Sequence, residues 1–136
     1  MTTIDNLKIK YPEAIALQFG DSPEMADELA ELIAKGIKTA SCSSLASFKH
    51  DHESPSLGSY SIILNSKHEP VCVIRVISLR IIRYCDVDYD FAKKEGEGDL
   101  SLSYWKQGHR NFFQREGSFD EAMELVAEEF ELTEIL

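Results

Sequence analysis

Four side chains with chemically useful groups lie close together near position 40. Lys38 supplies an amine, and Thr39, Ser41 and Ser43 supply hydroxyls. A lysine beside a hydroxyl can activate that hydroxyl as a nucleophile, although at pH 7 the lysine must be desolvated to act as a base. The same groups can also hold a polar ligand without any reaction. The segment therefore predicts a hydroxyl nucleophile activated by Lys38, or a polar binding site.

The helix that precedes this segment is marked by signals at both of its ends. Ser22 is a natural N-cap, and an apolar stripe follows it. Gly36 can take the left-handed conformation that ends a helix. A helix over residues 22–35 would therefore end within two residues of Lys38.

The spacing of Lys38 and Ser41 sets a geometric condition on their meeting. Residues three apart point to opposite faces of a regular strand. Lys38 and Ser41 converge only if Lys38 lies in the turn before the strand that we expect over residues 39–44, or if that strand is bulged. Otherwise the hydroxyls form a solvated strand face.

The remaining elements follow from hydrophobic patterns and turn residues. Together they predict an α+β fold, a sheet that is open or closed into a barrel, with helices at its ends. The strand over residues 71–83 is apolar on both faces, so we expect it to be covered on both sides. We predict helices over 4–10, within 86–94, over 101–115 and, at a capping box, over 118–121; strands over 59–64, 71–83 and 129–132; and a loop over 49–57.

Length and charge narrow the function classes. A chain of 136 residues is the size of a single domain, 1–136. Its net charge is −10, and residues 116–136 contain acidic residues but no Lys or Arg. An acidic protein is a poor non-specific binder of DNA or RNA, because that affinity rests on neutralising phosphates. A nucleoside or short RNA bound in a local cleft remains compatible with this charge.

Other sequence features indicate a cytoplasmic protein without a cofactor. The first residues lack the basic and apolar regions of a signal peptide, and no apolar run is long enough to span a membrane. Cys42, Cys72 and Cys85 are odd in number and lack CxxC spacing, as expected of reduced cysteines. No phosphate-binding glycine loop or zinc-finger spacing occurs. The sequence leaves the oligomeric state open.

Charged residues further along the chain are candidates for the same site. Glu95 could orient Lys38 or exchange a proton with a leaving amine. Glu97 and Asp99 compete for this role, and Asp99 could instead cap the next helix.

Arg75 is a charged residue in the largely apolar first half of the predicted strand, which also holds Arg80 and Arg83 further along. A buried arginine needs an acidic partner or a ligand, so we expect it to pair with Glu95 or Asp99 or to face a substrate carbonyl.

Aromatic and histidine residues are weaker candidates for binding a ligand or a metal ion. Trp105 and His109 lie four residues apart on a predicted helix, where they form part of the core or line a nucleobase pocket. His50 and His52 sit among acidic residues in the predicted loop, without a second cluster of metal ligands. We therefore predict no metal site.

Five motifs in order resemble the bacterial YhfF-like branch of the ASCH domain family. The resemblance covers roughly residues 11–135 and implies a PUA-like β-barrel with flanking helices. It does not rest on a single decisive motif. The motifs are FGDSP (Phe19–Pro23), GIKTAS (Gly36–Ser41), PVCVI (Pro70–Ile74), FAKKEGEGD (Phe91–Asp99) and SLSYWKQGHRNFF (Ser101–Phe113).

The resemblance implies a function in nucleoside or RNA chemistry. ASCH domains are thought to bind RNA or nucleotides beside the barrel, one small member removes the acyl group from N4-acetylcytidine, and others are reported to cut RNA. The residues that correspond to the amidohydrolase site are Lys38, Ser41 and Glu95, with Ser here in place of Thr. We therefore expect an amidohydrolase, a non-catalytic RNA-binding module or a ribonuclease. The expected ligand-binding residues are Thr39, Ser43, Arg75, Asp99, Trp105 and His109.

Overall fold

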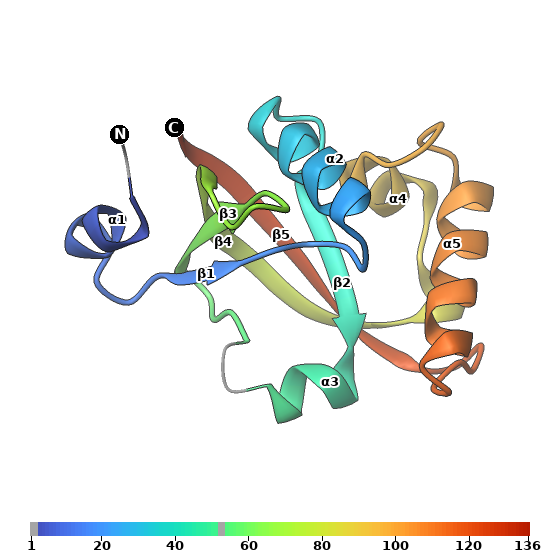
Figure 1. Ribbon diagram of the computed structural model, residues 1–136. Helices are drawn as coiled ribbons and strands as arrows, with labels where there is room; N and C mark the ends of the chain where they lie inside the picture. Colours follow the sequence, from blue (N-terminus) through green and yellow to red (C-terminus); the bar gives the residue numbers. More distant parts are fainter. Residues whose placement is uncertain (1–2, 52–53) are drawn as a thin grey trace.

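A computed structural model describes residues 3–51 and 54–136. Its centre is a five-stranded sheet in the order β1-β3-β4-β5-β2, in which β1 pairs parallel to β3 and the other neighbours are antiparallel. The sheet curls into half a barrel (Figure 1). The strands are β1 (Ile15–Leu17), β2 (Ala40–Ser44), β3 (Tyr60–Leu64), β4 (Pro70–Arg83) and β5 (Glu124–Ile135).

Helices cover the ends and one side of this sheet. Figure 1 shows α1 at one end of the molecule and α4 and α5 at the other, with α2 above the sheet and α3 below it. The α+β prediction is confirmed. The helices are α1 (Ile4–Lys10), α2 (Pro23–Ala34), α3 (Leu45–His50), α4 (Tyr89–Glu95) and α5 (Leu102–Arg115), with a short 3-10 turn at Tyr84–Asp86.

The predicted helix signals were correct where a cap and an apolar face occur together. The Ser22 hydroxyl accepts from the Met25 amide, and Gly36 has a φ of 75°. The Ser101 hydroxyl caps α5 in the same way. The predicted helix over 118–121 was wrong, since residues 118–120 have no regular secondary structure and a turn follows at 121–122.

Two short elements were not predicted. Strand β1 has three residues and pairs with β3 from a distant part of the chain. Helix α3 begins directly after β2, where the Ser44 hydroxyl accepts from the Ser47 amide. The predicted loop over 49–57 therefore loses its first residues to α3, and His52 in this loop lies outside the described residues.

The core divides into three clusters, one for each group of helices. One lies between the α4–α5 pair and strands β2 and β5, and includes Phe91, Trp105 and Phe113. A second lies under α2, and a third under α1. The first cluster fixes α4 and α5 against β2, the strand that carries Ser41.

Strand β4 is covered on both faces only in its first half. Cys72, Val73 and Ile74 are fully buried, whereas Ile77 and Ile81 are 52% and 58% exposed. The pairing with β5 shifts register between Val76 and Ser78, and such a bulge bends a strand. The expectation of cover along the whole strand was therefore wrong.

Among the described helices, none has the length and apolar character needed to cross a membrane.

Candidate functional site

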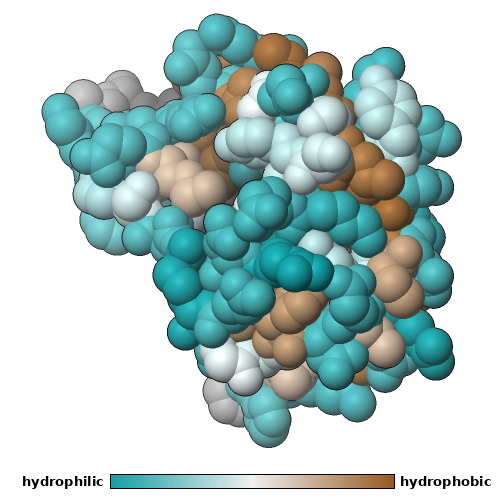
Figure 2. Space-filling model, turned by 90° about the vertical axis from the view of Figure 1, so that its right-hand side faces the viewer, coloured by the Kyte–Doolittle hydropathy of each residue, from teal (hydrophilic) through white to brown (hydrophobic). Residues whose placement is uncertain are grey.

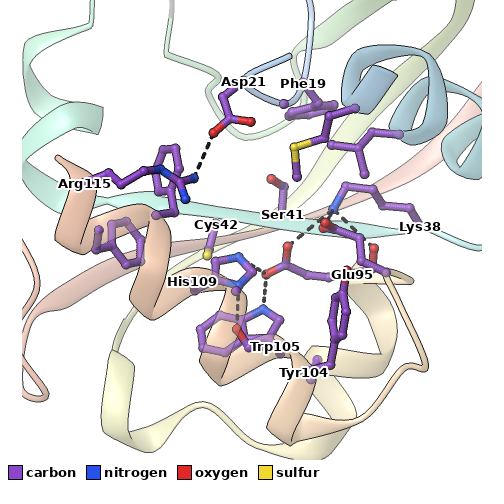
Figure 3. A pocket seen from close by; sticks show the side chains of 18 residues that line it. Phe19, Asp21, Lys38, Ser41, Cys42, Glu95, Tyr104, Trp105, His109 and Arg115 are labelled. Atoms are coloured by element: carbon purple, nitrogen blue, oxygen red, sulfur yellow. Dashed lines mark hydrogen bonds and ion pairs between the residues drawn. The ribbon is translucent and has the colours of Figure 1, made fainter. Parts of the chain in front are cut away.

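A pocket of about 250 Å³ lies between α2, α4, α5 and the start of β2. Aromatic side chains form much of its wall, and charged side chains lie at its base and rim (Figure 3). Met25, Tyr104 and Phe112 are exposed at 36%, 51% and 36%. On the side of the molecule that carries α5, a band of hydrophobic residues crosses an otherwise hydrophilic surface (Figure 2). The aromatic wall comprises Phe19, Tyr104, Trp105, His109, Phe112 and Phe113.

Lys38 is buried at the base of this pocket and is only 2% exposed. Its Nζ donates to Glu95 Oε1 at 3.3 Å, to the Glu95 carbonyl oxygen at 3.3 Å and to Glu97 Oε2 at 3.0 Å. An ammonium group has three donors, so each donor has an acceptor. Burial alone would lower the pKa of Lys38, but the charges of Glu95 and Glu97 raise it. Lys38 is therefore a fixed cation and not a base.

Gly96 allows the chain to bring both glutamates to Lys38. It ends α4 in the left-handed conformation, with a φ of 71°. A Cβ at this position would lie 2.7 Å from the carbonyl oxygen of Ile37, so only glycine permits this approach of α4 to the residues before β2. The Thr39 amide also donates to the Lys94 carbonyl oxygen at 2.7 Å. The segment before β2 is thus held against the end of α4.

Glu95 connects Lys38 to α5. Its Oε2 accepts from Trp105 Nε1 at 2.5 Å and lies 3.6 Å from His109 Nε2. Burial alone would raise the pKa of the Glu95 carboxyl, but Lys38 and His109 lower it to about 2. Burial alone would lower the pKa of His109, but the hydrogen bond and charge of Glu95 raise it. The base of the pocket is therefore a network of fixed charges.

Ser41 and Cys42 leave β2 on opposite faces, as successive strand residues do. Figure 3 shows Cys42 directed toward His109 and Ser41 directed toward the side of Phe19. Both residues line the pocket. Lys38 precedes the first residue of β2, Ala40, which satisfies the geometric condition set by the sequence.

Glu128 lies directly across from Ser41 on the neighbouring strand β5. Side chains at paired positions of antiparallel strands lie on one face, about 5 Å apart at Cβ. A second pocket, of about 290 Å³, is lined by Ser41 and Glu128 and shares Phe19, Ser41 and Cys42 with the first pocket. Burial raises the pKa of the Glu128 carboxyl to about 7, although the charge of Lys38 opposes this. Ser41 therefore stands between two pockets, beside a carboxyl that can exchange a proton near neutral pH.

A family profile described as the ASCH domain matches residues 15–134 of the chain. The chain belongs to the ASCH domain family. Among proteins with curated descriptions, none matches this ASCH domain.

Solved structures agree with this assignment. An ASCH domain from Lactobacillus crispatus JV V101 is 36% identical, with a TM-score of 0.85 over 98% of this chain and 87% of that one. A protein from Enterococcus faecalis V583 is 34% identical, with a TM-score of 0.81 over 96% and 85%. The hypothetical protein PH0355 is 17% identical, with a TM-score of 0.56 over 88% and 97%, and shares the fold alone. The predicted PUA-like fold is confirmed, with the sheet as half a barrel.

The structure of the ASCH domain brings five of the nine predicted site residues to the first pocket. Trp105 belongs to the core and also lines this pocket, where it is 3% exposed and its ring is stacked on His109 at a centroid distance of 4.0 Å. His109 is partly exposed and remains available to a ligand. The five residues are Lys38, Ser41, Glu95, Trp105 and His109.

The other four predicted site residues do not line the first pocket of the ASCH domain. Thr39 faces the end of α4, and Ser43 lines the second pocket only. Arg75 is exposed, its Nε donates to the Gly58 carbonyl oxygen at 3.2 Å, and its guanidinium lies 5.5 Å from the Tyr60 ring centroid. The expectation of a buried Arg75 paired with an acid of the site was wrong, because β4 turns this position to solvent.

Asp99 has a structural role. It is exposed, and its Oδ1 accepts from the Ser101 amide at 2.9 Å, which lowers its pKa. Asp99 therefore holds the residue that caps α5, which is Ser101, but is not the cap itself, and it does not line the first pocket.

Three pocket residues were missed as candidates. Cys42 was predicted only to be a reduced cysteine, although its position one residue after Ser41 signals that it faces the opposite side of β2. Tyr104 precedes Trp105 and lines the same pocket. Glu128 carried no signal, because its meaning depends on a register with β2 that the sequence does not reveal.

Proposed function

We propose that this ASCH domain binds a nucleoside in the first pocket and hydrolyses an amide on an acylated base, with N4-acetylcytidine as the test substrate. The carrying observation is the position of Ser41, which lines that pocket and lies across from Glu128. The substrate class comes from the family resemblance given above.

The shape and charge of the first pocket favour a small neutral ligand. Its aromatic wall offers flat surfaces for a nucleobase, and bases stack on such side chains. The positive charge of Lys38 is already matched by Glu95 and Glu97, and Arg115 pairs with Asp21 at 3.0 Å. This leaves little cation to neutralise a chain of phosphates. A nucleoside fits these properties better than a polynucleotide.

Ser41 and Glu128 fit the roles of nucleophile and base. The Glu128 carboxylate takes the Ser41 hydroxyl proton while Oγ attacks the amide carbonyl carbon, which forms a tetrahedral intermediate. Collapse of the intermediate breaks the C–N bond, and the proton held by Glu128 passes to the leaving exocyclic amine. Water then attacks the acyl-serine ester while Glu128 takes its proton, and Glu128 passes that proton to the departing Ser41 Oγ, which releases a carboxylic acid and restores the serine. A pKa of about 7 suits both directions of this transfer.

Lys38 and Glu95 have supporting roles in this scheme. Lys38 is not the base that activates Ser41, and its three donors are already taken by Glu95 and Glu97, so it fixes both carboxylates at the base of the pocket. The sequence led us to expect that Glu95 carries the proton of the leaving group. The pKa of its carboxyl is too low for that role. Glu95 holds Lys38 and His109 in place.

The experiment is hydrolysis of N4-acetylcytidine by the purified protein, followed by chromatography of cytidine. Ser41→Ala should abolish turnover, while Ser43→Ala is the matched control, since Ser43 lies on the same strand outside the first pocket. We expect Ser43→Ala to keep most of the activity. Activity that survives in Ser41→Ala would refute the nucleophile.

Absence of turnover would favour the non-catalytic alternative. Short single-stranded RNA should then bind with an affinity that falls steeply as salt rises, whereas nucleoside binding should be insensitive to salt. Cleavage of the RNA, lost in Ser41→Ala and kept in Ser43→Ala, would instead support a ribonuclease. Each result contradicts the amidohydrolase proposal.

A further inference from the structure

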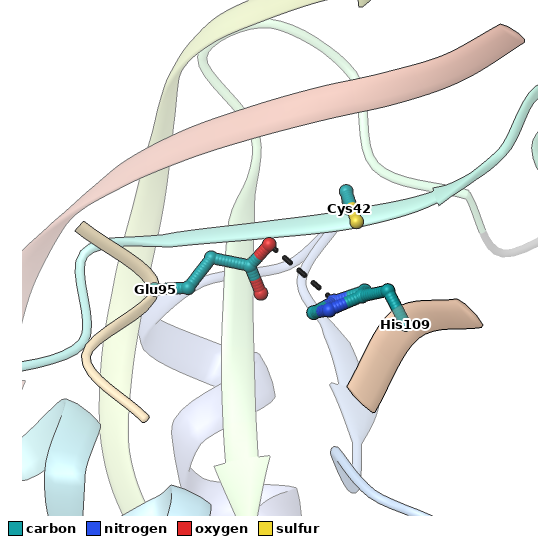
Figure 4. A group of neighbouring side chains, drawn as sticks. All are labelled: Cys42, Glu95 and His109. Atoms are coloured by element: carbon teal, nitrogen blue, oxygen red, sulfur yellow. Dashed lines mark ion pairs between the residues drawn. The ribbon is translucent and has the colours of Figure 1, made fainter. Parts of the chain in front are cut away.

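Three side chains with different donor atoms meet on the α5 side of β2. Cys42 lies on β2, Glu95 at the end of α4 and His109 on α5 (Figure 4). The Cys42 Sγ, a Glu95 carboxylate oxygen and a His109 ring nitrogen lie within 4.8 Å of one another. The sequence predicted no metal site, since these donors are spread over 68 positions of the chain and form no local spacing.

The hydrogen bond of the His109 ring decides which nitrogen faces the cluster. Nδ1 lies 2.9 Å from the Trp105 carbonyl oxygen. A carbonyl oxygen can only accept, so Nδ1 carries a hydrogen. In the neutral ring Nε2 then holds a lone pair, which faces Glu95 Oε2 at 3.6 Å. Two acceptors in this arrangement require a cation between them, either a proton on Nε2 or a metal ion.

The surroundings of the three donors match those of protein metal sites. Ligating histidines commonly donate their other ring N–H to a backbone carbonyl, and ligating carboxylates are themselves hydrogen-bonded. His109 makes the first of these bonds to Trp105, and Glu95 Oε2 accepts the second from Trp105 Nε1. Trp105 therefore orients two of the donors at once.

The distances are close to those that zinc requires. Zinc binds sulfur at about 2.3 Å and nitrogen or oxygen at about 2.0–2.2 Å, so donors of a tetrahedral site lie about 3.3–3.8 Å apart. The separation of 3.6 Å between His109 Nε2 and Glu95 Oε2 lies within this range. The Cys42 Sγ lies within 4.8 Å of the other two donor atoms, and a metal ion would draw it closer to them.

Charge also permits a divalent ion. Glu95 and Glu97 carry two negative charges, and Lys38 neutralises one of them. A protonated His109 supplies the missing positive charge. A divalent metal ion together with a Cys42 thiolate also has a net charge of plus one. The metal–thiolate pair can therefore replace the proton on His109 and leave the network neutral.

We propose that Cys42, Glu95 and His109 form a binding site for a zinc-like divalent transition metal, with its fourth position open to the first pocket. All three residues line that pocket, so a water molecule or a ligand nitrogen or oxygen can reach the fourth position. Binding releases the Cys42 thiol proton and any proton on His109 Nε2. Three protein ligands and one open position are typical of catalytic rather than structural zinc sites.

This inference does not depend on the proposed amide hydrolysis. Ser41 and Glu128 lie on the other face of β2, so the metal takes part in none of the steps assigned to them. The ion would lie beside the bound base, where it could coordinate a ring nitrogen or a carbonyl oxygen of the ligand.

The experiment is titration of the reduced, chelator-treated protein with Co²⁺, read by absorbance, and with Zn²⁺, read by calorimetry. We expect one ion per chain, a near-ultraviolet thiolate-to-cobalt band, visible bands of a tetrahedral site, and displacement of Co²⁺ by Zn²⁺. Cys42→Ser should remove the thiolate band. Cys42→Ser and His109→Gln should each weaken Zn²⁺ binding at least tenfold.

Cys85 provides the matched control, because it is a free and exposed cysteine outside the cluster. Cys85→Ser should bind both ions as the unaltered protein does. The proposal is overturned if the unaltered protein gives no thiolate band, or if Zn²⁺ binding is lost in Cys85→Ser and kept in Cys42→Ser. Since these readouts need no substrate, they are separate from the outcome of the hydrolysis experiment.

Discussion

Replacement of Lys38 by Met should destabilise the protein far more than loss of a surface lysine. The ammonium is buried and donates to three oxygens of Glu95 and Glu97, and Glu95 itself is 2% exposed. Without Lys38, the Glu95 carboxylate stays buried and loses its nearest cation. Breaking a buried ion pair from one side costs about 3–5 kcal/mol. For a chain of this size the loss corresponds to a fall in Tm of about 10–20 °C.

Lys94 is the control for Lys38, because it forms an ion pair of shorter distance that is exposed to solvent. Its Nζ lies 2.8 Å from Glu129 Oε1, closer than Lys38 lies to either carboxylate, but the Lys94 side chain is 49% exposed. Exposed pairs contribute about 0–1 kcal/mol. Lys94→Met should therefore change the free energy of unfolding by less than about 1 kcal/mol. Distance alone would predict the opposite order.

The assay is urea unfolding at pH 7, followed by circular dichroism. Lys38→Met should shift the midpoint strongly with an unchanged slope, and the double variant Lys38→Met/Glu95→Gln should recover part of the loss because it removes the buried charge. A cost below about 1 kcal/mol for Lys38→Met, or an equal cost for Lys94→Met, would refute the reasoning.

Three further predictions follow from the same structure. The folded protein holds a proton on Glu128 up to a pH of about 7, whereas the unfolded chain releases it near pH 4.5. As the pH rises from about 4.5 to 7, the free energy of unfolding, measured relative to Glu128→Gln, should therefore decrease by on the order of 2–3 kcal/mol. Equal differences in urea midpoint between the two proteins at pH 4.5 and at pH 8 would contradict this. Gly96→Ala should lower the free energy of unfolding by more than about 2 kcal/mol, since its Cβ would meet a backbone oxygen at 2.7 Å. Gly117→Ala should lower it by only about 1 kcal/mol, since nothing lies within 4 Å of a Cβ there. Similar melting temperatures for the two variants would argue against the clash. Trp105→Phe removes the N–H that donates to Glu95 and should lower the free energy of unfolding by about 1.5–3 kcal/mol. It should also shift the pKa of His109, which a proton NMR titration can detect. An unchanged pKa of His109 would show that Trp105 does not orient this network.

The sequence was informative wherever a local signal fixes local geometry. Ser22 and Ser101 marked the starts of α2 and α5, and Gly36 marked a left-handed residue after a helix. These signals act over three or four residues, so they survive without knowledge of the fold. The position of Lys38 just before β2 followed from them.

Features that depend on pairing between distant segments were missed or misjudged. Glu128 faces Ser41 only because β5 pairs with β2 in one register, and a shift of one residue would turn it to the other face. Arg75 was expected to be buried because its neighbours in sequence are apolar, but a strand residue takes its surroundings from its own face of the sheet. Ser118 resembled a helix cap, but β5 begins at Glu124, and its pairing with β4 and β2 overrides the local helix signal.

The strand order has a consequence for how the protein is made. Strand β2 lies at an edge of the sheet and pairs with β5, which begins 80 residues after β2 ends. During synthesis, Ser41 and Cys42 leave the ribosome long before the strand that orders them exists. Pairings of this separation form slowly, and an unpaired edge exposed in the meantime invites association with other chains. We therefore expect both pockets to form last in folding, and the nascent chain to depend on protection of β2 until residue 129 has emerged.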